Sequence, residues 1–119
     1  KCDRCIELLL KYDTKARMAE AKYIRSEEAE IMEEVEGVHI MDLAAFSAKL
    51  KGGGELFHRV GTLLGFVCSG SKRCHTHVLE MLRVKNSGIG VVKAALEEFA
   101  SVLDEGEQQT QLEDFLDKI

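Results

Sequence analysis

The sequence lacks proline and tryptophan, and aromatic residues make up only 6% of it. Proline commonly marks turns and edge strands, so its absence favours long helices joined through Gly, Ser and Asn. Because aromatic side chains are few, aliphatic residues and alanine must form most of the core, and a hydrophobic content of 45% is enough for one. We therefore expect an all-α fold in these 119 residues, either as one domain or as one end of a longer array.

A basic surplus is also missing, since the net charge is −5. Proteins that bind a nucleic-acid backbone usually carry positive charge in excess, so we expect no direct contact with nucleic acid. The apolar runs fall short of the roughly 20 residues that span a bilayer, so we expect no membrane partner. The chain starts at Lys1 within an expected helix, and we therefore expect a segment of a longer protein.

The second half of the chain has the clearest helical periodicity. Apolar residues recur at steps of three and four after residue 55, which predicts a helix that stops at Ser69-Gly70. Ser71 is expected to cap the next helix, and Ser87 or Gly88 to start a third one. A last short helix is expected after the acidic-Gly stop at 104–106. The expected inward face of the first of these helices consists of Leu56, Val60, Leu63, Leu64 and Val67.

The first half has weaker apolar patterning. Helical stripes are predicted over 2–12 and 14–36, with Asp13 and Thr14 either interrupting the first helix or capping the second. Asp42 is expected to begin a short helix up to Lys51, and Gly52–Gly54 to form a flexible connection after it. We thus divide the chain into 1–54, with an acidic stretch and this connector, and 55–119. About six or seven helices with short loops are typical of an armadillo- or HEAT-like repeat end.

Two stretches resemble a known family. They are LFHRVGTLLGFVCSGSKRCHTHVLEMLRVKNSGIGVVKAALEEFASVLDEG and KCDRCIELLLKY. The order of helices, caps and loops in them resembles the C-terminal part of the beta-catenin-like armadillo proteins of spliceosomes. The resemblance covers about 75 residues well and 14–54 poorly.

This resemblance implies a non-catalytic nuclear scaffold linked to pre-mRNA splicing complexes. It also implies partners among splicing-complex components and basic peptide segments, bound mainly by upstream repeats, with residues 55–119 capping the solenoid. No enzyme activity and no cofactor are expected.

Cysteine and histidine spacing supports an alternative function. Cys2-x-x-Cys5 and Cys74-x-x-His77 supply three thiolates and an imidazole, which is the ligand count of a closed zinc site. Cys2-x-x-Cys5 alone also fits a redox motif. The alternative is therefore a small zinc- or redox-dependent helical regulator. Against it, Cys2 and Cys5 share an expected apolar helix face with Ile6, where free cysteine acts as a small hydrophobic residue.

Charged residues provide candidate partner contacts. A basic cluster with two histidines lies in the first turns of the helix expected after Ser71. It is expected to be a solvated face, or to contact an acidic partner surface or the acidic stretch 27–36 of the same chain. A glutamate run between residues 27 and 36 is a solvated face or a surface for basic peptides. His58 is expected to be partly buried and hydrogen-bonded rather than catalytic. The candidate contact residues are Lys72, Arg73, His77, Glu30, Glu33 and Glu34.

Overall fold

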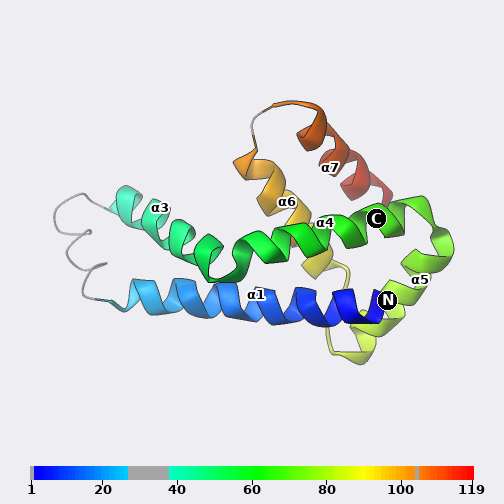
Figure 1. The fold of residues 1–119 in the computed structure, drawn as a ribbon, viewed down its shortest axis with the longest axis horizontal. Helices are drawn as coiled ribbons and strands as arrows, with labels where there is room; N and C mark the ends of the chain where they lie inside the picture. Colours follow the sequence, from blue (N-terminus) through cyan, green and yellow to red (C-terminus); the bar gives the residue numbers. More distant parts are fainter. Residues whose placement is uncertain (1, 27–37, 104) are drawn as a thin grey trace. The chain divides into compact units, whose positions relative to one another are not determined.

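The computed structural model describes residues 2–26, 38–103 and 105–119. Within these residues every regular element is a helix, so the expected all-α class is confirmed there (Figure 1). The repeat type and the number of helices stay predictions. The elements are α1 (Cys2–Ile24), α3 (Val38–Lys49), the π-helical turn η1 (Leu50–Gly54), α4 (Glu55–Gly70), α5 (Lys72–Val84), α6 (Gly90–Val102) and α7 (Glu107–Lys118).

Contacts divide the chain into two units. Unit 1 consists of Lys1–Leu10 and Phe57–Ile119, and unit 2 consists of Lys11–Leu56. The first turns of α1 thus belong to the same unit as the C-terminal helices, whereas the rest of α1 belongs to the unit of α3 and η1. The predicted boundary after Gly54 lies near one of the two points where the chain passes between units.

Unit 1 has an aliphatic core to which α1, α4, α5, α6 and α7 all contribute. Glycines on α4 allow α6 to approach closely: a Cβ at Gly61 would meet the side chain of Ala95, and one at Gly65 would lie 3.0 Å from Leu96 Cδ1. α5, α6 and α7 each turn apolar side chains into this core. The fully buried large side chains of unit 1 are Ile6, Leu9, Leu64, Val78, Leu82, Val92, Leu96 and Leu112.

The inward face predicted for α4 is wrong in its orientation. Leu64 is 1% exposed, but Leu63 is 51% exposed. The buried side of α4 is lined by Phe57, His58, Gly61, Leu64, Gly65 and Cys68. The face predicted from the large apolar residues is rotated about the helix axis by roughly a third of a turn from the observed one. The glycines mark the side that α6 approaches.

Unit 2 is built on small residues. A Cβ at Gly52 would meet the side chain of Ala19, and Gly53 has a φ of 138°, a conformation that glycine adopts without strain. A Cβ at Gly53 would also lie 3.2 Å from the carbonyl oxygen of Tyr12. The predicted flexible connection is therefore corrected: these glycines form a kinked turn in close contact with α1.

Several helix ends differ from prediction by a few residues. α1 continues through Asp13, whose carboxylate accepts a bond from Arg17 at 3.0 Å within the helix. The backbone of α3 starts at Val38 rather than at Asp42. α6 starts at Gly90 rather than at Ser87 or Gly88, and the turn after α5 contains Asn86 in the left-handed region. By contrast, the ends of α4 at Gly70 and of α6 at Val102 agree with the sequence signals.

Candidate functional site

The predicted basic cluster lies in unit 1, at the start of α5. Ser71 has an extended backbone, and its side-chain oxygen accepts the backbone N–H of Cys74 at 3.2 Å. This is the predicted N-cap, and it satisfies one of the free donors at the helix start. The cap fixes where α5 begins and thereby sets the side on which Cys74 and His77 lie, one turn apart.

His77 connects α5 with the first turn of α1. Its Nε2 lies 2.8 Å from Oδ1 of Asp3, and both side chains are about half exposed. Lys72 and Arg73 are exposed, and neither makes an ion pair with a described residue. These two residues remain predicted partner contacts. The predicted acidic contacts, Glu30, Glu33 and Glu34, lie outside the described residues.

Three thiols lie near this junction, those of Cys2, Cys68 and Cys74, and Cys68 was not among the predicted site residues. Burial, and to a smaller extent the neighbouring thiols of Cys2 and Cys74, raise the pKa of Cys68 from 9.0 to about 11. Cys68 is buried, whereas Cys2, Cys5 and Cys74 are half-buried, and all four thiols are free. Cys68 lies on the buried side of α4. Its importance was missed because the sequence had predicted a different side of α4 to face inward.

The metal-site alternative gains no support from this arrangement. Across residues 2–26, 38–103 and 105–119, no group of three or more His, Cys, Asp or Glu side chains is placed to hold a metal ion. Cys2, Cys5, Cys74 and His77 are all described and do not form such a group. A thiol whose pKa is raised by burial is also a weaker nucleophile at neutral pH, because little of it is thiolate.

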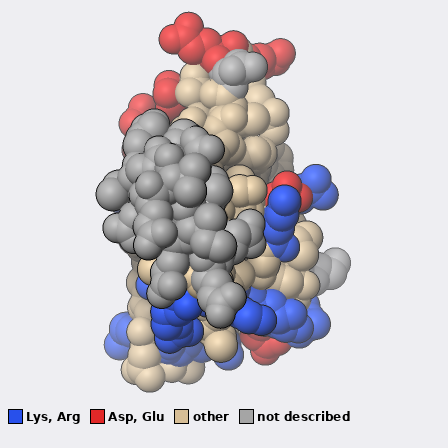
Figure 2. Space-filling view, turned by 90° about the vertical axis from the view of Figure 1, so that its left-hand side faces the viewer, with Lys and Arg blue, Asp and Glu red and all other residues tan. Residues whose placement is uncertain are grey.

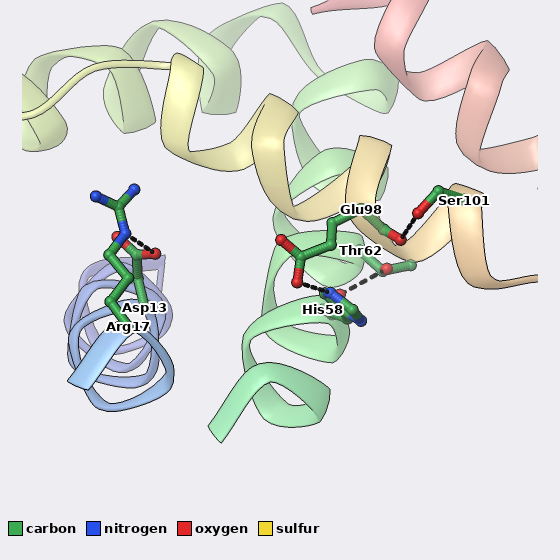
Figure 3. A network of polar contacts seen from close by, with 6 residues as sticks. All are labelled: Asp13, Arg17, His58, Thr62, Glu98 and Ser101. Carbon is green, nitrogen blue, oxygen red and sulfur yellow. Dashed lines mark hydrogen bonds and ion pairs between the residues drawn. The ribbon is translucent and has the colours of Figure 1, made fainter. Parts of the chain in front are cut away.

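A buried polar pair joins α4 to α6 in the core of unit 1. His58 is 3% exposed, and its Nε2 lies 2.9 Å from Oε1 of Glu98 (Figure 3). The imidazole stacks on the ring of Phe99 with a centroid distance of 5.4 Å. Thr62 donates to the carbonyl oxygen of His58 one turn earlier on α4. The predicted hydrogen bond of His58 is confirmed, but the side chain is fully buried rather than partly buried, and its partner Glu98 had not been predicted.

The burial of this pair determines its role. A 3% exposed imidazole is not accessible to a substrate, and its ring is enclosed by Phe99 and by a carboxylate on the neighbouring helix. A buried polar group without a partner would cost about 1–3 kcal/mol, which the bond to Glu98 avoids. We therefore assign the pair to packing of α4 against α6.

An apolar face of α4 remains outside the core of unit 1. Leu63 and Phe66 are 51% and 61% exposed. Phe66 meets the ring of Phe115 on α7 edge-on, with centroids 6.0 Å apart, so only part of its surface is covered. Val60 and Val67 lie on the same side and are half-buried. This face can contact another apolar surface.

Acidic side chains gather at another place in unit 1. Figure 2 shows Asp and Glu side chains at the top of the view, over the turn between α6 and α7. Glu105 and Glu107 are exposed there.

No helix among the described residues is both long enough and apolar enough to span a membrane. Comparison with family models, with curated proteins and with solved structures finds no match for this chain.

Proposed function

We propose that the chain is the C-terminal part of a non-catalytic, armadillo-type scaffold of the beta-catenin-like kind that associates with splicing complexes in the nucleus. The observation that carries the proposal is the order of features from Leu56 to Gly106. An amphipathic helix, a Ser-capped helix, a tight turn and a third amphipathic helix follow one another with short connections. This is the order in which the same features occur in the family that the sequence resembles.

The packing of unit 1 supports a solenoid end. α4 contacts α6 through its glycines and α7 through Phe66, while part of its apolar side stays uncovered. Each helical repeat in a solenoid packs on its neighbours, and the terminal repeat closes the apolar core. In this proposal the main peptide-binding surface lies in upstream repeats, and unit 1 caps the array.

Co-precipitation from nuclear extract tests the proposal with two baits, this chain and the full-length gene product that contains it. The full-length bait should recover splicing-complex proteins, and the chain alone should recover few of them. A third bait, the full-length product without residues 56–119, should retain the partners but unfold at a lower temperature. Failure of the full-length bait to recover splicing proteins would contradict the proposal, whereas recovery by the chain alone would replace the cap with a binding surface.

The alternative function, a zinc- or redox-dependent regulator, stays a prediction. Elemental analysis of the purified chain measures its zinc content directly. Stoichiometric zinc that is lost in a Cys2→Ser or Cys74→Ser variant would favour it over the scaffold.

A further inference from the structure

Unit 2 presents a row of basic side chains along one side of α1. Lys11, Lys15, Lys22 and Arg25 follow at steps of four, seven and three residues, which bring them to the same side of a helix. Met18 lies in the middle of the row and is 66% exposed. We call Lys11, Lys15, Met18, Lys22 and Arg25 the basic stripe. Figure 2 shows Lys and Arg side chains gathered around α1 at the bottom of the view.

The stripe has no acidic partner among the described residues. None of its four cations makes an ion pair with them, whereas Arg17, on a different side of α1, pairs with Asp13 at 3.0 Å (Figure 3). The ammonium groups of Lys11 and Lys15 both lie over the ring of Tyr12, at 5.8 and 5.7 Å from its centroid. Like charges at i, i+4 destabilise a helix by about 0.2–0.5 kcal/mol per pair, so a negative surface beside the stripe would relieve this repulsion.

We propose that the basic stripe binds an acidic protein segment that places one apolar side chain against Met18. The stripe spans 14 residue steps, or about 21 Å of helix, which matches a short helical segment of similar length. Exposed methionine is enriched at protein interfaces, where it adapts to the partner's side chain. A phosphate backbone has no apolar group to place there.

Charge around the stripe also favours a short peptide over a nucleic acid. The chain carries a net charge of −5, and six glutamates occur in the sequence between residues 27 and 36, starting two residues after Arg25. A nucleic acid brings one negative charge per roughly 1.7 Å of duplex to a chain whose own net charge is negative. A peptide limited to the stripe meets the cations alone. The basic stripe is separate from the surface for basic peptides that we propose for the upstream repeats.

A displayed library of random 14-residue peptides, selected on the full chain, tests the proposal. Selected peptides should contain several Asp or Glu residues and one central Leu, Ile, Phe or Met. Their affinity, measured by fluorescence anisotropy, should fall about tenfold in the double variant Lys15→Glu and Lys22→Glu, and at least threefold in Met18→Ala. The matched control is Arg17→Glu, which reverses a charge on the same helix and should change affinity less than twofold.

Three results would overturn the proposal. The first is a selected set that is neutral or basic. The second is an equal loss of affinity in Arg17→Glu and in the stripe variants, measured on chains with the same helix content by circular dichroism. The third is tighter binding of a 14-nucleotide oligouridine than of the best selected peptide at 150 mM salt, which would assign the stripe to nucleic acid.

Discussion

In unit 1, buried leucines pack beside the glycines through which α4 meets α6, whereas in unit 2 α1 meets the turn η1 through alanine and glycine. Leu64 and Leu96 are almost completely buried in unit 1. The buried apolar side chains of the described part of unit 2 are those of Ala16 and Ala45. Burial of a leucine contributes about 1.5–3 kcal/mol, and alanine contributes far less. Unit 1 thus depends on side-chain volume as well as on close backbone approach, and the described part of unit 2 mainly on close backbone approach.

Loss of side-chain volume should therefore affect unit 1 far more than unit 2, whereas an added methyl group should affect either unit where a glycine meets a neighbouring helix. Loss of methylene groups creates cavities in a core that large side chains fill. Added methyl groups produce clashes where glycines face small residues. Substitutions in both units test this difference.

The largest effect is expected for Leu64→Ala on α4. The free energy of unfolding, measured by urea denaturation, should fall by about 2–5 kcal/mol, because a 1% exposed side chain leaves a cavity. The adjacent Leu63→Ala is the matched control, since Leu63 is 51% exposed, and it should change stability by less than about 0.5 kcal/mol. Equal effects of the two variants would show that α4 is oriented differently.

In unit 2, Gly52→Ala should destabilise the chain by about 1–3 kcal/mol, because the new methyl group meets the side chain of Ala19. The control is Gly70→Ala, where nothing lies within 4 Å of an added Cβ. This control should be neutral or stabilise by up to about 1 kcal/mol. A tolerated Gly52→Ala, judged by its thermal midpoint, would remove the distinction between the units.

The interior of unit 1 should also respond to alkaline pH through Cys68. Burial raises the pKa of this thiol from 9.0 to about 11, so folding favours its neutral form. The corresponding stability is complete below pH 9 and is lost as the pH rises through 11, by about 1–2 kcal/mol at pH 10.5. The measurement compares the wild type with Cys68→Ala at pH 8 and pH 10.5, because lysine and tyrosine titrations are common to both. Identical losses in the two chains would contradict the prediction.

The smallest effect is expected at the surface of unit 1, for Asp3→Asn. Its bond to His77 is half exposed, so its loss should cost less than about 0.5 kcal/mol, and less still in 1 M salt. A double-mutant cycle with His77→Ala isolates the contribution of the pair. A coupling above about 1 kcal/mol would make this junction as important as the core.

The sequence predicted the helices more accurately than their orientation. The Ser71 cap, the end of α4 at Gly70 and the buried His58 follow from local chemistry, which one sequence contains. The side of α4 that faces inward could not be predicted from the sequence, because Leu63 and Leu64 have the same hydrophobicity. Only the approach of α6 to Gly61 and Gly65 distinguishes the two leucines.

The candidate site shows the same limit. Lys72, Arg73 and His77 were selected by charge and spacing, but the bond from His77 to Asp3 joins residues 74 positions apart. Cys68 became relevant only when folding placed it near Cys2 and Cys74. The packing role of the triple glycine was missed because the sequence does not show that Ala19 faces Gly52.

The bond between His58 and Glu98 has a consequence for the uniqueness of the fold. Leucine contacts between two helices tolerate a shift by one helical turn, about 5.4 Å, since another aliphatic side chain can occupy the vacated place. A polar pair inside such a contact opposes the shift, because separating the partners leaves the buried imidazole of His58 without its bond to Glu98. The pair therefore specifies a single register of α4 along α6.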